Sequence, residues 1–277
     1  MLNCDSFDDL ENITIKTDLG KYMHSKFNEA VELVCTNFDI YRFNDVATAL
    51  YRFIWGEFCD WGIEFSKADK ESIIELGAIF KESLKLLHPI MPFITEYLFH
   101  QLSNTTLEDS KSIMLLKYPS ANSRDLEIEK SFEIVKDCIT SIRRLKKNLN
   151  LSGSLDRVYI RVKNSTDTGS YMLYIKKIAK VDNIEFIKQK PLDCVCDIGE
   201  FIEVYVPKGE IDLAPIIKQL ESKKAKLQKE IDKLNGMLGS EKFIKNAPKE
   251  VVETNKEALK RAMDGIKDVE ESLSSLS

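Results

Sequence analysis

Lysines are concentrated between Lys218 and Lys249, and this is the residue pattern best suited to bind a ligand. The segment holds nine lysines against four acidic residues, although the whole chain has a net charge of −5. Lysines that line one element neutralise phosphates, so this segment is suited to bind an extended polyanion such as RNA. On charge alone, the stronger expectation is that the lysines only solubilise a coiled coil. The candidate contacts are Lys223, Lys226, Lys229, Lys233, Lys242 and Lys245.

A second basic group lies near the middle of the chain. Lys136, Arg143 and Lys147 are seven and four residues apart, so they share one stripe of a predicted helix. Arg144 and Lys146 lie close by, and we expect the five to contact phosphates. The alternative is a solvated helix end whose positive charges interact with the helix dipole.

Aromatic and basic residues also alternate near Tyr41. Unstacked RNA bases are read by stacking and by hydrogen bonds to their edges, so Tyr41, Arg42, Phe43 and Arg52 are candidates for that role. A core position is the stronger expectation for three aromatic residues, namely Phe43, Phe53 and Trp61.

No motif for catalysis is found. The sequence lacks the glycine-rich nucleotide loops, the G-x-S-x-G elbow and the H-E-x-x-H zinc motif, and its three histidines stand apart. Glu57 and Asp60 beside Trp61 fit a helix surface or a buried pair as well as an acid and base. Six scattered cysteines without a C-x-x-C pair argue against zinc. We therefore expect no catalytic residue, cofactor or metal in this chain.

Two heptad patterns must position the terminal lysines. Apolar residues alternate by four and three from Leu213 to Leu238 and again from Val252 to Leu276. Gly239 and Pro248 between them are a helix stop and a helix start. The pattern predicts an antiparallel coiled-coil arm over 211–277, about 40 Å long at 1.5 Å per residue.

The rest of the chain divides into a helical and a mixed part. Apolar spacing predicts helices over 23–38, 46–65, 73–87, 94–102 and 128–149, which form an antiparallel bundle over 18–150. The apolar pattern of residues 151–210 predicts a small α/β module. Its strands are expected near 157–162, 184–187, 194–196 and 201–206, and its helix over 171–179. Residues 1–17 are expected to be a leader or edge segment. The predicted fold class is mainly α.

Composition adds limits on location. Neither a secretion signal nor a membrane span is visible, and the scattered cysteines suit a reducing compartment. We expect a cytoplasmic monomer without a membrane partner.

Three strings in the first half resemble the anticodon-binding domain of valyl-tRNA synthetases. They are YRFND from Tyr41, LYRFIWGEFCDW from Leu50 and LLHPIMPFITE from Leu86. The HPIMPF string is common to valyl, leucyl and isoleucyl enzymes, whereas EFCDW is more particular to the valyl branch. KFIKNAPKEVV from Lys242 looks like the turn of the C-terminal coiled coil of valyl enzymes. Isoleucyl relatives usually end in a cysteine zinc module, which is missing here.

The resemblance covers nearly all residues from 19 to 276 and implies a function. The bundle is expected to meet the anticodon end of valine tRNA, and the arm the outer corner of the L-shaped molecule. The family's catalytic and editing domains, with the HIGH and KMSKS signatures, have no counterpart here. We therefore expect a C-terminal part of a bacterial enzyme, which partners its own catalytic domain and cannot use ATP alone. A free-standing RNA-binding or chaperone-like protein and a protein-interaction coiled coil remain alternatives.

Overall fold

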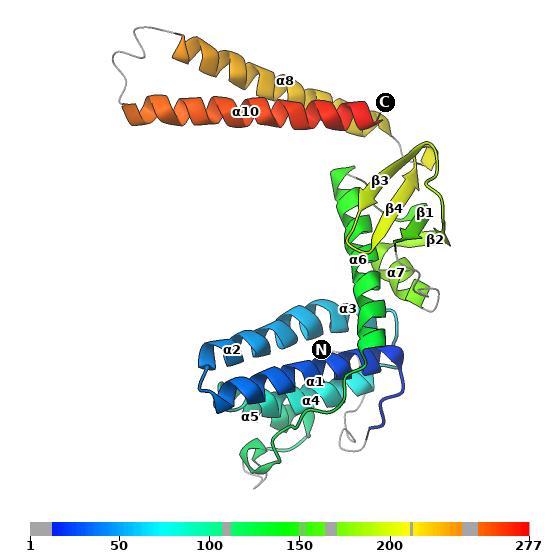
Figure 1. The fold of residues 1–277 in the computed structure, drawn as a ribbon, viewed down its shortest axis with the longest axis vertical. Coiled ribbons are helices and arrows are strands. Elements are labelled where there is room, and N and C mark those ends of the chain that lie inside the picture. Colours follow the sequence, from blue (N-terminus) through cyan, green and yellow to red (C-terminus); the bar gives the residue numbers. More distant parts are fainter. Residues whose placement is uncertain are drawn as a thin grey trace.

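The structure is a computed structural model that describes residues 13–106, 112–149, 151, 153–163, 171–210, 213–239 and 249–276. A helical bundle lies at one end of the molecule, a small sheet lies beside it along α6, and a helical hairpin lies at the other end (Figure 1). The predicted fold class is confirmed. The predicted leader falls largely on residues outside the described ranges.

The bundle contains the helices that apolar spacing predicts. Thr17 begins the first by accepting a hydrogen bond from the Gly20 amide at 3.0 Å, and Asp125 begins the last by accepting one from Ile128 at 3.1 Å. Pro92 stands in the first turn of α5. The elements are α1 (Asp18–Asp39), α2 (Phe43–Tyr51), η1 (Arg52–Gly62), α3 (Ile63–Ser66), α4 (Ile73–Leu87), α5 (Pro92–Leu102), the short 3₁₀ turn η2 (Ile113–Leu115) and α6 (Leu126–Asn148).

The predicted helix over 46–65 is continuous, but its middle is not α-helical. Residues Arg52–Gly62 form a π-helix between α2 and α3. Such wide turns are rare and are frequent at functional sites. Phe53 and Phe58 are buried on its inner side, which keeps this segment attached to the bundle.

The α/β module is a four-stranded sheet with the order β2-β1-β4-β3. Strands β1 and β2 are parallel and are connected through α7 (Met172–Ala179), whereas β4 is antiparallel to both β1 and β3. The strands are β1 (Leu155–Val162), β2 (Val181–Phe186), β3 (Cys194–Ile198) and β4 (Ile202–Pro207), and the 3₁₀ turn η4 (Lys208–Glu210) follows.

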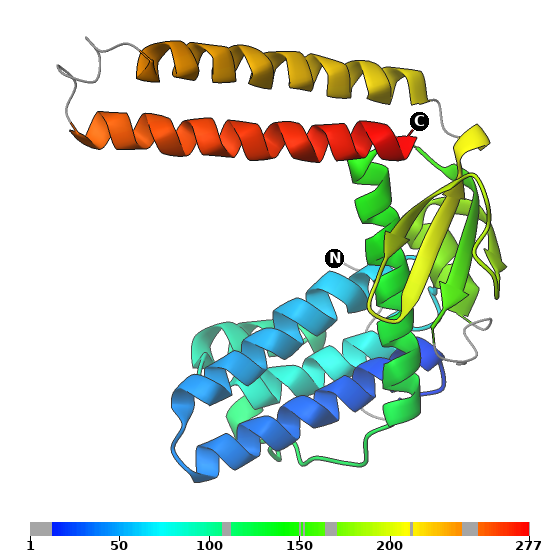
Figure 2. The same cartoon turned by 45° about the horizontal axis from the view of Figure 1, so that its top comes forward.

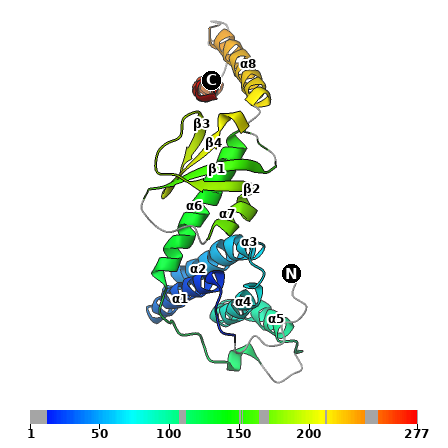
Figure 3. The ribbon, with the colours of Figure 1, turned by 90° about the vertical axis from the view of Figure 1, so that its right-hand side faces the viewer.

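Helix α6 connects the two parts. It packs against α1 in the bundle and against α7, β3 and β4 in the module, and Figure 3 shows it running from one into the other. Buried side chains of both parts form one hydrophobic cluster, which includes Val34, Phe132, Ile142 and Val204. The core therefore continues across residue 150, and the predicted boundary there stays a prediction.

Gly199 permits the sheet to approach α6 closely. A Cβ atom at this position would lie 2.3 Å from Oδ1 of Asp137, whose other oxygen accepts the Phe201 amide at 2.7 Å. We expect Gly199→Ala to lower the free energy of unfolding by about 1–3 kcal/mol through overpacking. Urea denaturation measures this, and Gly209→Ala is the control because a Cβ there meets nothing within 4 Å. Equal stability of the two variants would contradict the close contact.

The arm consists of α8 (Leu213–Leu238) and α10 (Lys249–Leu276), which lie side by side (Figures 1 and 2). Ile231 and Leu234 of α8 and Ala262 and Val269 of α10 are buried between them. The predicted antiparallel hairpin is therefore present, with helix bounds within a few residues of the heptad patterns. Within the described residues, no helix is long and apolar enough to cross a bilayer.

Candidate nucleic-acid interface

One side of α8 carries exposed lysines along its length. Lys226, Lys229 and Lys233 are three and four residues apart, so they share one face, and this face points away from the buried Ile231 and Leu234. Lys223 is also exposed, but it precedes Leu227 by four residues and so lies at the edge of the seam. We call Lys226, Lys229 and Lys233 the lysine face.

Lys224 interrupts the apolar pattern and has a different role. Its ammonium lies 2.8 Å from Glu270 of α10, so it connects the two helices of the arm. An ion pair at this place fixes how the helices align. Its positive charge is thus already matched within the hairpin.

The two helices of the arm differ in charge. Helix α8 has six lysines against three acids, whereas α10 has five basic residues against seven acids. The positive potential is therefore concentrated on α8, as the sequence predicts. Lys242 and Lys245, also predicted to bind RNA, lie outside the described residues.

The basic stripe of α6 is largely engaged within the protein. Arg143 donates to Glu64 at 3.1 Å, and Arg144 donates to both carboxylate oxygens of Asp197 at 2.6–3.1 Å. The hydrogen bond to Asp197, with its charge, raises the pKa of Arg144. These arginines connect α6 to α3 and to β3.

Lys146 and Lys147 differ although they are neighbours. The Lys146 ammonium donates to the carbonyl oxygens of Gly153, Ala179 and Lys180 at 2.8–2.9 Å, so it caps the turn between α7 and β2. Partial burial, and then the charge of Lys180, lower the pKa of Lys146. Lys147 is exposed, so it remains the best placed of this stripe for a phosphate.

Lys136 is buried, which argues against its predicted phosphate contact. Its ammonium lies 2.7 Å from Glu57 and 3.0 Å from Glu133, and also lies over the rings of Tyr22 and Trp61. Burial favours a higher pKa for Glu57, but the charge and hydrogen bond of Lys136 outweigh this and lower the pKa. Glu57 is thus half of a buried pair, one of the three roles considered for it.

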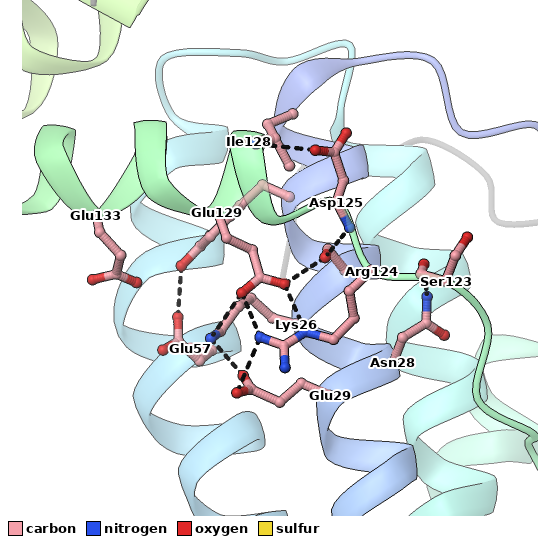
Figure 4. Close-up of polar contacts among 12 residues, drawn as sticks. Lys26, Asn28, Glu29, Glu57, Ser123, Arg124, Asp125, Ile128, Glu129 and Glu133 are labelled. Atoms are coloured by element: carbon pink, nitrogen blue, oxygen red, sulfur yellow. Dashed lines mark hydrogen bonds and ion pairs between the residues drawn. The ribbon is translucent and has the colours of Figure 1, made fainter. Parts of the chain in front are cut away.

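A second polar network lies at the start of α6 (Figure 4). Arg124 donates to Glu129 at 2.6 and 3.0 Å and lies 3.1 Å from Glu29 of α1. Ser25 accepts the Asp125 amide at 2.8 Å. The network fixes the segment that leads into α6, so it is structural.

The aromatic candidates divide into exposed and buried residues. Phe53 is buried and Trp61 stacks on Phe65, as expected for core residues. The core prediction was wrong for Phe43, which is 54% exposed and packs edge-on against Phe38 and Tyr41. Its position at the first residue of α2, directly after the turn, explains this.

The turn between α1 and α2 presents Tyr41 to solvent. Tyr41 is 79% exposed and has a φ of 59°, a conformation rare for a residue with a side chain. Arg42 pairs with Asp45 at 3.2 Å but is mostly exposed, and Arg52 is exposed one helix further on. These residues are accessible to an RNA, although no contact groups Arg52 with the turn.

Sequence reasoning missed a polar cleft between the bundle and the module. It has a volume of about 680 Å³, and its walls include Lys16, Lys70 and Lys177 together with Asp69. These residues come from three separate segments, so no local pattern predicted the cleft. Lys177 donates to the Ala68 carbonyl at 3.1 Å, which holds α7 against the bundle. Within the described residues, no group of acidic, histidine and cysteine side chains is placed to hold a metal.

Comparison with known proteins assigns both parts of this arrangement. Residues 20–162, about half of the chain, match the anticodon-binding domain of tRNA ligases. The chain belongs to that family. Residues 212–277 match the tRNA-binding arm of valyl-tRNA synthetases, so the resemblance that the sequence indicated is confirmed.

Relatives of this anticodon-binding domain protein extend the match to nearly the whole chain. The valine–tRNA ligase of a Nitratiruptor species is 52% identical over 98% of the chain. That of Campylobacter jejuni is 49% identical over 91%, and that of Aquifex aeolicus 31% identical over 91%. These alignments cover 31%, 30% and 24% of the respective relatives. The chain therefore spans about a third or less of their length.

Proposed function

We propose that this chain is the tRNA-binding portion of a valine–tRNA ligase. The bundle binds the anticodon end of valine tRNA, and the arm binds its outer corner with the lysine face. The observation that carries this proposal is the row of exposed lysines on a stiff hairpin at the opposite end of the molecule from the bundle. A folded RNA is long enough to meet both at once.

Contacts remote from the bond-making centre serve catalysis by positioning. The proposed parent enzyme joins valine to its tRNA with ATP, and it needs the acceptor end of the tRNA held still. Binding energy from distant parts of a substrate supplies that positioning. The chain itself has no group to which we assign a chemical step, so we expect no aminoacylation activity from it alone. The proposed location is cytoplasmic.

The isolated chain is expected to bind valine tRNA with a steep salt dependence. Each phosphate that a lysine neutralises releases counterions, so six contacts would weaken binding on the order of 1000-fold between about 50 and 200 mM salt. Filter binding over a salt series measures the slope. If the arm were instead a protein-interaction coiled coil, tRNA affinity would hardly change with salt concentration. That result would contradict the proposal.

Anticodon recognition is tested with RNA rather than with protein variants. A valine tRNA with a changed anticodon should bind more weakly, because the bundle loses its base contacts, while the salt slope should stay the same because phosphate contacts remain. Gel-shift titration of both RNAs measures the difference. Equal affinities would instead favour a general RNA-binding or chaperone-like protein.

A further inference from the structure

A groove with apolar walls opens between the α2–η1 helix and the turn that joins α4 to α5. Its volume is about 250 Å³, and Leu50, Tyr51, Trp55, Leu87 and Met91 are among its walls. None of the residues that line it is charged. Apolar hollows of this kind on a protein surface mark contacts with another apolar surface.

The side chains around the groove are unusually exposed for their type. Tyr51 is 66% and Trp55 57% exposed, although large aromatic residues are normally buried for the most part. Helix α5 begins directly after the groove wall and adds two more exposed aromatic residues. Phe93 is 90% exposed, and Tyr97, one turn later, is 52% exposed. We call Tyr51, Trp55, Met91, Phe93 and Tyr97 the apolar patch.

This exposure is built on ordered backbone. The amides of Ile90 and Met91 donate to the Leu87 carbonyl at 3.0 and 3.1 Å, and the Thr95 hydroxyl donates to the Met91 carbonyl at 2.8 Å. Tyr51 and Trp55 stack with their rings 11° apart. The patch is therefore a preformed surface.

The helix beneath the patch includes the π-helical segment, and Gly56 lies next to Trp55 within it. A glycine within a helix is destabilising relative to alanine, yet a Cβ atom at Gly56 would meet nothing within 4 Å. A missing side chain beside an exposed aromatic residue suits the close approach of another backbone.

We propose that the apolar patch is the docking site for an apolar face of the part of valine–tRNA ligase that this chain does not span. This inference rests on the proposed membership in that enzyme. The relatives are at least three times as long as the matched segment, so most of their polypeptide must pack somewhere. An RNA occupant is disfavoured because no lysine or arginine lines the groove to neutralise a phosphate.

Hydroxyl-radical footprinting of a full-length chimera tests the proposal. The part of the Nitratiruptor enzyme that this chain lacks is joined to the chain, and side-chain oxidation is compared with that of the isolated chain. Oxidation of Trp55, Met91, Phe93 and Tyr97 should fall at least fivefold in the chimera, whereas Leu192, 93% exposed and outside the patch, should be unchanged. Unchanged oxidation of the patch in the chimera would overturn the proposal.

Controls separate the other occupants. Protection that appears in the isolated chain and grows with its concentration would identify a second copy, and protection that needs valine tRNA would identify RNA; either overturns the proposal. In the chimera, Trp55→Glu should restore oxidation at Phe93 and Tyr97, and Leu192→Glu should not. The footprint without RNA does not depend on tRNA affinity, so failure of tRNA binding and failure of docking are distinguishable.

Discussion

Replacing Lys226, Lys229 and Lys233 by glutamate is expected to weaken valine tRNA binding on the order of 100-fold at about 0.15 M salt. The three side chains share the outer face of α8, away from the seam with α10. Loss of three phosphate contacts should also lower the slope of log affinity against log salt by about 3. The effect should be similar for any tRNA, because phosphates carry no sequence information.

A matched variant on the other helix separates position from net charge. Lys256, Lys260 and Lys267 of α10 are exposed too, and replacing all three by glutamate changes the charge by the same amount. We expect a much smaller loss of affinity, because α10 is already acidic overall. Filter binding across a salt series measures both variants, and circular dichroism confirms that the arm stays helical. Equal losses would show that net charge alone governs binding and would remove the lysine face from the proposal.

Lys136→Met is expected to lower the free energy of unfolding by about 3–5 kcal/mol. The lysine is buried, and its ammonium is the close counter-charge of Glu57 at 2.7 Å. Without it, the Glu57 carboxylate keeps the hydrogen bond from the Tyr22 hydroxyl, also 2.7 Å long, and the weaker attraction of the Lys26 charge. Urea denaturation measures the loss, and Lys147→Met, at an exposed position of the same helix, should change stability by less than about 0.5 kcal/mol.

The pH dependence follows from the pKa of Glu57. In the native protein this pKa is lowered, so the pair stabilises the fold above the ordinary value of 4.5 and the contribution is lost as pH falls through the lowered value. In Lys136→Met, burial would raise the pKa of Glu57. Its buried negative charge would then destabilise the fold at neutral pH, and protonation would remove this destabilisation. The difference between the two proteins should therefore shrink as pH falls from 7 toward about 4.5.

A double variant identifies the source of that loss. Glu57→Gln removes the negative charge but keeps an acceptor for Tyr22, so adding it to Lys136→Met should recover most of the stability. If Lys136→Met cost under about 1 kcal/mol, the lysine would not be the essential counter-charge of Glu57.

Helix positions were predictable because apolar residues recur with the helical period over long stretches. The break at His88 to Pro92 and the two heptad patterns follow from local rules for proline and for coiled coils. The π-helical turns of η1 were not predictable, because their hydrogen-bond shift depends on what packs against Phe53 and Phe58. Fold class thus follows from periodicity, and local distortion from tertiary contacts.

Charged candidates were harder to predict than elements. Lys136 and Lys147 share a predicted stripe, yet one is buried beside Glu57 and the other is exposed. The difference arises because Tyr22 of α1 and Glu57 and Trp61 of η1 lie against Lys136, and a sequence period does not identify such covering residues. On α8 the partner helix was itself predictable, so the outward direction of Lys226 and Lys229 was as well.

The shared core along α6 determines which parts of the protein should unfold together. Because one side of this 23-residue helix completes the bundle and another side completes the sheet, amide hydrogens in both should exchange through a single opening event. The buried seam of the arm lies outside that cluster, so the hairpin should open as a second unit. For a tRNA that contacts both ends, the bundle and the sheet would then keep a fixed position relative to each other. Any adjustment to the shape of the tRNA would come from movement of the hairpin.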